Sequence, residues 1–201
     1  MPALQNKSYF NYGGQGPLPT PSLEAISKSW NKIQQLGPFT NDVWPYIASE
    51  IKATKSLLAS ICGVTVNRVA LTENVTSGCV LPMLGLPFRP GDHILISDCE
   101  HPGILYACME LAQRQRLYID ILPVKSLLNG ANKLKDTERS LIDNLEVKLQ
   151  AKTKLVVLSH ILWNTGQIMS ISAVAERISN HPSKPYLLVD AAQSFGQIPI
   201  K

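Results

Sequence analysis

The sequence predicts an α/β protein, with a mostly parallel, doubly wound sheet that helices cover. Short runs of consecutive apolar residues occur at 94–96, 155–158 and 186–189, without the polar alternation of a half-buried strand. Such runs are typical of strands that are buried on both faces. Helical patterns alternate with these runs along the chain, as expected for a parallel sheet.

The first half of the chain contains four expected elements after a turn-rich start. Glycines and prolines between Gly13 and Pro19 cannot continue a helix or a central strand. Ser22 is placed to cap the first helix, Gly37 follows its end, and Gly63 ends the second helix. We expect helices over 22–36 and 44–61, a strand over 69–72 and a helix over 76–84.

The second half continues the alternation of strand and helix. The Pro90-Gly91-Asp92 turn precedes an apolar strand, and a polar stretch over 125–136 predicts a loop. We expect strands over 93–97, 118–123, 155–158 and 186–189, and helices over 102–114, 137–150 and 170–180.

Composition excludes several classes of protein. The 201 residues carry a net charge of +4, and no run of five basic residues occurs, so nucleic-acid or anionic-membrane binding has no support. No apolar stretch is long enough for a signal peptide or a spanning helix. The four cysteines form no CxxC pair, which argues against a zinc site or a disulfide scaffold. We therefore expect a soluble, cytoplasmic protein without a metal site.

Polar residues follow the predicted strands. Ligands of open α/β sheets bind beyond the carboxyl ends of the strands, so these clusters predict a binding site. A single cluster is equally consistent with an ordinary turn or cap, but four together favour a site. The four clusters span residues 73–78, 98–103, 160–166 and 190–194.

Two of the clusters suggest a ligand by their chemistry. Asn74-Val75-Thr76 opens a helix whose free N–H groups attract an anion, although no glycine fingerprint of a dinucleotide or P-loop site is present. Asp190 ends a buried strand and needs a cation or several donors. The protonated ring nitrogen of pyridoxal phosphate would suit it, and Gln193 can donate to the phenolic oxygen. The alternative is that Asp190 caps the next turn.

His101 and Asn164 each have two interpretations. His101 is either an exposed or capping residue, or a ring that stacks on a cofactor and exchanges protons. Asn164 is either a turn residue or a donor to the oxygen substituent of the cofactor ring.

The ordered series TENVTSG, SDCEHPG, SHILWNTGQ and VDAAQS resembles the class V aminotransferase family of fold type I pyridoxal phosphate enzymes. Within that family, the likeness is greatest to the cystine and cysteine C–S lyases of cyanobacteria, which are related to the cysteine desulfurases. The opening NKSYFNYGGQGPLPTPSLEAI is also similar to those lyases. The resemblance extends over essentially the whole chain.

The resemblance implies pyridoxal 5′-phosphate as cofactor and assigns roles to single residues. Asn74, Val75 and Thr76 would bind the phosphate. His101 would stack on the ring and act in catalysis. Asp190 would pair with the ring nitrogen, and the ring hydroxyl oxygen would be contacted by Asn164 and Gln193. Gly14 and Gln15 would lie near the carboxylate of the substrate.

The resemblance also implies a domain plan. Residues 1–20 would be a segment near the active site, and residues 21–201 would form part of the cofactor-binding large domain. The Schiff-base lysine of the family follows the aspartate-bearing strand at some distance, whereas this sequence ends at Lys201. We therefore expect an N-terminal half, in which the lysine and the small C-terminal domain are absent. Whether such a chain is active alone stays open.

Three functions remain as hypotheses. The first is a lyase that acts on cystine or cysteine by β-elimination and yields pyruvate, ammonia and a persulfide or sulfide. The second is a cysteine desulfurase that delivers persulfide sulfur to an acceptor. The third is a truncated, non-catalytic protein that binds pyridoxal phosphate or a partner. The resemblance further implies a homodimer of the full-length form.

Overall fold

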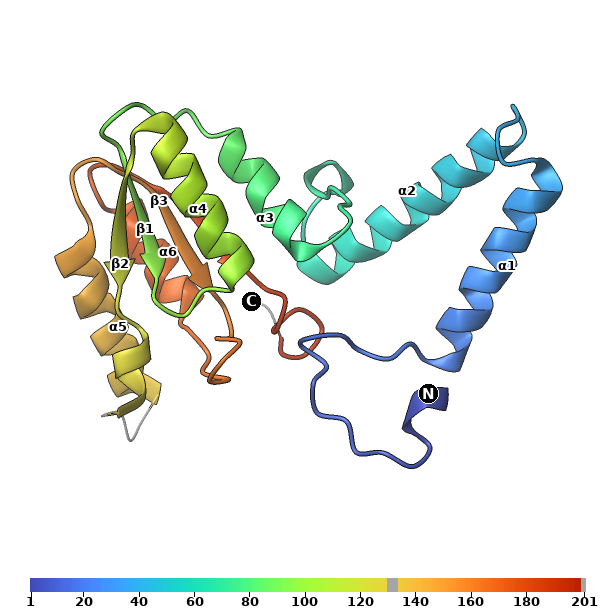
Figure 1. Ribbon diagram of the computed structural model, residues 1–201, viewed down its shortest axis with the longest axis horizontal. Coiled ribbons are helices and arrows are strands. Elements are labelled where there is room, and N and C mark those ends of the chain that lie inside the picture. Colours follow the sequence, from blue (N-terminus) through green and yellow to red (C-terminus); the bar gives the residue numbers. More distant parts are fainter. Residues whose placement is uncertain (130–133, 200–201) are drawn as a thin grey trace. The chain divides into compact units, whose positions relative to one another are not determined.

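The chain folds into two compact units. The computed structural model describes residues 1–129 and 134–199, and the two units divide between Leu71 and Thr72 (Figure 1). No helix among these residues is apolar over a length that could cross a membrane.

The first unit is helical. It consists of η1 (Pro2–Leu4), α1 (Thr20–Leu36), α2 (Val43–Cys62) and η2 (Val66–Arg68). As predicted, α2 ends at Gly63, whose φ of 64° is the left-handed conformation that glycine adopts without strain. The prediction that Ser22 caps α1 is wrong. The helix already begins at Thr20, and the backbone N–H of Ser22 donates to the carbonyl of Pro19 over 3.0 Å.

The predicted strand over 69–72 is also wrong. This segment has no regular secondary structure and pairs with no strand among residues 1–129 and 134–199. An apolar run forms a strand only where a second strand accepts and donates its backbone hydrogen bonds. The run alone therefore did not determine the structure.

The second unit contains a parallel sheet of four strands. These are β1 (His93–Ser97), β2 (Tyr118–Leu122), β3 (Thr153–Ser159) and β4 (Tyr186–Asp190), in the order β2-β1-β3-β4. Ile96 is the register partner of both Ile121 and Val157, and Ser159 is the partner of Asp190. The predicted fold class and these four strands are confirmed. The strand order reverses between β1 and β3, because the chain leaves β1 toward β2 and later returns to the other side.

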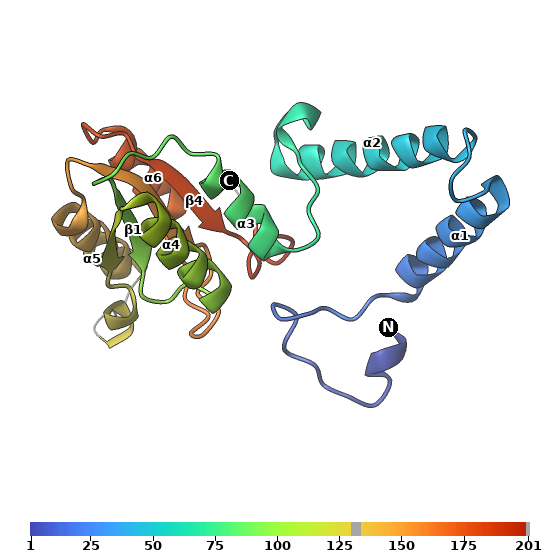
Figure 2. The same ribbon diagram turned by 45° about the horizontal axis from the view of Figure 1, so that its top comes forward.

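Helices cover both faces of this sheet. They are α3 (Val75–Leu84), α4 (Pro102–Gln115), α5 (Leu134–Lys148) and α6 (Ile171–Ser179). Ile94 and Ile96 pack with α3 and α4, whereas Leu95 and Leu158 pack with α5 and α6. Figure 1 shows α4 and α6 on opposite faces, and Figure 2 shows α3 beside β4. Both faces are thus buried, as the apolar runs predicted.

One predicted loop is partly helical. The polar stretch over 125–136 contains η3 (Lys125–Asn129), and α5 begins at Leu134 rather than at residue 137. Residues 130–133 of this predicted loop lie outside the described residues. The polar composition did not prevent helix formation, because α5 packs Leu141 and Leu145 against the sheet.

The buried cysteines provide a test of this core. Burial raises the pKa of Cys79 to about 11 and that of Cys108 to about 12, and negative charge on Glu100 raises both further. The thiolate is the reactive form, so we expect alkylation of both at pH 8 to be at least about 100-fold slower than alkylation of the exposed Cys62. Peptide mapping after timed iodoacetamide treatment measures the three rates, and urea should make them similar. Equal rates in the native protein would contradict this core.

Candidate functional site

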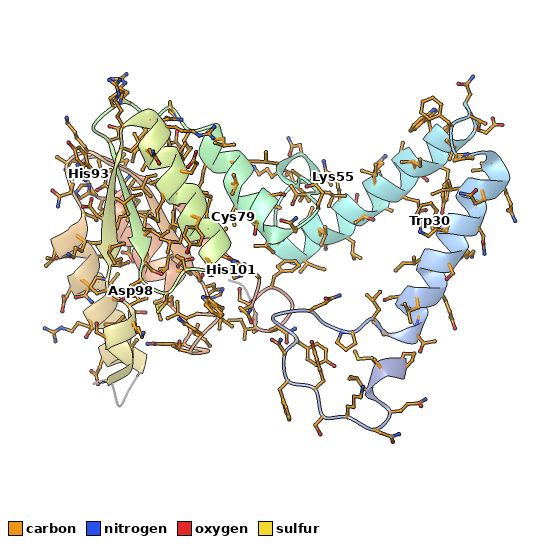
Figure 3. The ribbon with its side chains drawn as sticks, viewed as in Figure 1. Trp30, Lys55, Cys79, His93, Asp98 and His101 are labelled. Carbon is orange, nitrogen blue, oxygen red and sulfur yellow. The ribbon has the colours of Figure 1, made fainter. Side chains whose placement is uncertain are left out.

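The N-termini of α3 and α4 meet next to the carboxyl ends of the strands. Gly103, in the first turn of α4, lies between them. A Cβ atom at this position would be 3.2 Å from Thr76 Oγ1 and 3.3 Å from His101 Nδ1. The glycine therefore lets Thr76 and His101, which come from different helices, approach one another. Figure 3 shows His101 and Asp98 at the end of the sheet opposite to His93.

The start of α3 presents free backbone donors. Asn74 Oδ1 accepts the N–H of Ser77 over 2.9 Å, which caps the helix. The N–H groups of Val75 and Thr76 have no acceptor within the described part of the chain, and both residues are exposed. Two amides, one hydroxyl and the positive end of the helix dipole together form an anion-binding arrangement.

His101 caps the N-terminus of α4 and is held in one orientation. Its Nδ1 accepts the backbone N–H of Gly103 over 3.2 Å, so the neutral ring carries its proton on Nε2. The Trp163 ring stands edge-on to it, with 6.0 Å between ring centroids and an interplanar angle of 70°. The remaining surface of the imidazole is exposed. A flat ring with a donor at Nε2 is thus available to a ligand.

Asp190 is a buried carboxylate with one oxygen in use. Only 7% of the residue surface is exposed, and Oδ1 accepts the N–H of Ala192 over 2.9 Å. Oδ2 has no donor among the described residues. The capping role that the sequence offered as an alternative is therefore real, yet it leaves an acceptor for a cationic N–H group.

Gln193 and Asn164 lie on the loops after β4 and β3. Gln193 is half-buried, and its side chain makes no hydrogen bond within the described residues. Asn164 is exposed, and it lies close enough to Cys99, in the loop between β1 and α4, to lower the pKa of that thiol. Burial raises the pKa of the Cys99 thiol by more than Asn164 lowers it. Asn164 is thus brought next to the loop that bears His101.

Gly14 and Gln15 belong to the first unit, in a turn where the carbonyl of Asn11 accepts both of their N–H groups over 3.2 Å. The Tyr9 hydroxyl donates to the Gln15 carbonyl over 2.6 Å. Their contact with a substrate stays a prediction.

Two further acids, Asp98 and Glu100, flank Cys99 just before His101, and the sequence pattern assigned no role to them. Asp98 Oδ1 accepts the backbone N–H groups of Val124 and Lys125 over 2.8 and 3.0 Å. Glu100 is only 6% exposed and accepts hydrogen bonds from the ends of β1 and β3. Both acids follow a buried strand, as Asp190 does, and this signal in the sequence could have identified them.

Burial is the main influence on the ionisation of Glu100. It raises the pKa of this carboxyl, and the nearby negative charge of Asp190 raises it further, while hydrogen bonds from Ser97 and Ser159 lower it. Two carboxyl groups therefore share the edge of the sheet. A cation bound beside them would reduce their repulsion. No cluster of His, Cys, Asp or Glu suited to a metal ion is present in residues 1–129 and 134–199.

Known proteins resemble the chain along its whole length. A structure described as the cystine C–S lyase C-DES with its reaction product cysteine persulfide is 38% identical, with a TM-score of 0.90. It matches 100% of this chain, which covers 51% of the lyase. A second structure shows a C-DES mutant with glycine covalently linked to its PLP cofactor, again at 38% identity and a TM-score of 0.90.

Curated relatives are more distant. A probable cysteine desulfurase of Methanothermobacter thermautotrophicus is 22% identical over 205 residues, which are 100% of this chain and 47% of the relative. An uncharacterized aminotransferase of Schizosaccharomyces pombe is 22% identical over 193 residues, which are 96% and 44% of the two chains. The chain thus spans about half the length of the relatives that it matches.

The family described as Aminotransferase class-V has a sequence profile that matches residues 9–201. This match covers nearly all of the chain, and the parallel sheet and the two relatives called an aminotransferase and a cysteine desulfurase agree with it. The chain therefore belongs to the class V aminotransferase family.

Proposed function

We propose that the chain is the cofactor-binding part of a pyridoxal phosphate-dependent C–S lyase. Such an enzyme cleaves cystine or cysteine by β-elimination and yields pyruvate, ammonia and a persulfide or sulfide. The likeness to the cystine lyase, 38% identity along 100% of the chain, carries this proposal. Because the chain spans about half of that protein, the activity, the substrate, a homodimer and a cytoplasmic location are proposed for the whole protein.

The described residues fit pyridoxal phosphate. The two free N–H groups of Val75 and Thr76, together with the Thr76 hydroxyl, suit a phosphate, and Asn74 lies alongside. The Oδ2 of Asp190, which has no donor among residues 1–129 and 134–199, suits a protonated ring nitrogen, whose positive charge would offset the two neighbouring carboxyl groups.

The cofactor, when bound, supplies the electron sink that makes loss of the α-proton and of the β-sulfur feasible. The chain's own residues orient it. We assign to His101 the role of stacking on the cofactor ring, with the proton of the neutral imidazole on Nε2. We assign to Asn164 and Gln193 the contacts with the oxygen substituent of the cofactor ring. Gly14 and Gln15, in a segment 1–20 near the active site, would bind the substrate carboxylate, and residues 21–201 would belong to the large domain.

A cysteine desulfurase is the second candidate. The relative from Methanothermobacter thermautotrophicus, at 22% identity, favours it. The two activities differ in where the sulfur goes, since a desulfurase retains it on a protein cysteine and a lyase releases it in a small product.

Product analysis of the protein expressed from its natural gene tests the proposal. With cystine and pyridoxal phosphate, we expect pyruvate and ammonia in equal amounts and cysteine persulfide in the small-molecule fraction. Protein treated with an alkylating agent after turnover should carry no added sulfur by intact mass. Persulfide on the protein together with alanine as product would instead identify a desulfurase.

The Asp190→Asn variant tests the partner of the ring nitrogen. Asparagine can still accept the N–H of Ala192, but it cannot offset a buried positive charge. Loss of one partner from a buried ion pair costs about 3–5 kcal/mol, so we expect lyase activity to fall about 100-fold or more. Asp143→Asn, on the exposed surface of α5, is the control and should keep its activity. Activity within twofold of wild type in Asp190→Asn would refute this role.

The Thr76→Val variant tests the phosphate site. Valine preserves the shape of the side chain but removes the hydroxyl donor, and one such hydrogen bond is worth about 0.5–1.5 kcal/mol. We expect the Kd of pyridoxal phosphate to rise about two- to tenfold, measured by equilibrium dialysis. Thr137→Val on α5 should leave the Kd unchanged. The Kd of pyridoxal, which lacks the phosphate, should be equal in wild type and Thr76→Val.

A further inference from the structure

The loop between β1 and α4, residues 98–101, is held at both sides by its two acids. It is four residues long and ends at His101, the N-cap residue of α4. Such a short connection has few side chains with which to fix its conformation. Asp98 and Glu100 provide them: the Asp98 carboxylate contacts the segment just after β2, and the Glu100 carboxylate contacts the ends of β1 and β3.

Glu100 joins the ends of β1 and β3. Its Oε1 accepts the Ser97 hydroxyl over 2.5 Å and the backbone N–H of Ser159 over 2.8 Å. Its Oε2 accepts the Ser159 hydroxyl over 2.7 Å. Ser97 and Ser159 are the last residues of their strands and are themselves buried. Three buried hydrogen bonds therefore hold this one carboxyl group in place.

Asp98 holds the other side of the loop. The N–H groups of Val124 and Lys125, just after β2, both donate to its Oδ1. Its own N–H donates to the carbonyl of Leu122 over 3.1 Å. The loop is therefore attached to the strands on both sides of β1.

Glu100 lies between the ends of β1 and β3, at the edge of the sheet where a ligand is expected to bind. The strand order reverses between β1 and β3, and open α/β sheets bind their ligands at such a switch point. Glu100 bridges this pair of strands, His101 follows it in sequence, and Ser159 is the register partner of Asp190. Glu100 therefore contacts both the end of β1, which leads to His101, and the end of β3, which pairs with Asp190. His101 and Asp190 are the two residues proposed to contact the cofactor ring.

We propose that Glu100 is a positioning residue of the cofactor site. Through its hydrogen bonds to Ser97 and Ser159, it sets the orientation of His101 before any cofactor binds. This proposal rests on the proposed function for the identity of the ligand, but not for the orientation of His101 in the free protein. The role belongs to the hydrogen-bonding geometry of the carboxyl and not to its charge.

The test compares Glu100→Ala and Glu100→Gln with wild type and with Glu110→Gln, a control on the exposed part of α4. Glutamine can keep the bridge, because its amide accepts at one atom and donates to the Ser159 hydroxyl at the other. The first readout is the ¹⁵N signal of His101 in cofactor-free, whole protein labelled at histidine, assigned by its loss in His101→Gln. The second is the Kd of pyridoxal phosphate.

We expect wild type, Glu100→Gln and Glu110→Gln to share one His101 spectrum, with the proton on Nε2. Glu100→Ala should show a mixture of the two tautomers and a Kd raised about tenfold or more, as for the loss of a buried hydrogen-bonded acceptor. Ser159→Ala, which removes one donor, should change both readouts in the same direction by less. It also serves as the test if Glu100→Ala does not fold.

Two results would overturn the proposal. One is a wild-type His101 spectrum in both Glu100→Ala and Ser159→Ala. The other is a Glu100→Gln variant as impaired as Glu100→Ala, which would assign the role to charge. If wild type itself binds no pyridoxal phosphate, the proposed function fails, and the His101 spectra still decide the role of Glu100.

Discussion

Burial of the sheet on both faces is the constraint on which the rest of the structure depends. Side chains of β1 and β3 pack against α3 and α4 on one face of the sheet and against α5 and α6 on the other. Polar side chains placed within these strands would lose their contacts with water. Chemistry is therefore confined to the ends of the strands, where polar side chains and free backbone groups of helix N-termini come together.

Because polar side chains gather at the carboxyl ends of the strands, the acids buried there need hydrogen-bond donors. Glu100 is satisfied within the protein by two serine hydroxyls and one amide. Within the described part of the chain, Asp190 receives a hydrogen bond at one oxygen only. A carboxylate with complete partners can hold structure, whereas one with an open acceptor can receive a ligand. The two acids, although close enough to influence each other, are thus suited to different tasks.

Much of the fold could be predicted, and the errors have physical causes. The apolar runs at 94–96 and 155–158 became buried strands because burial of apolar side chains is favourable. The run at 69–72 failed as a strand because pairing depends on a partner elsewhere in the chain. Ser22 failed as a cap because Pro19 and Pro21 already favour a helix start at Thr20. Local sequence signals therefore predicted the buried strands correctly, but they predicted strand pairing and the ends of helices less well.

For the candidate site, the sequence by itself determined which residue types stand after each strand and which of them have the chemistry to bind a cofactor. It could not determine that Gly103 brings Thr76 and His101 together, that Asp190 keeps one oxygen free, or that Glu100 links β1 to β3. These facts depend on contacts between residues distant in the chain, such as Glu100 and Ser159. Only the register of neighbouring strands decides those contacts, and register is a property of the tertiary structure.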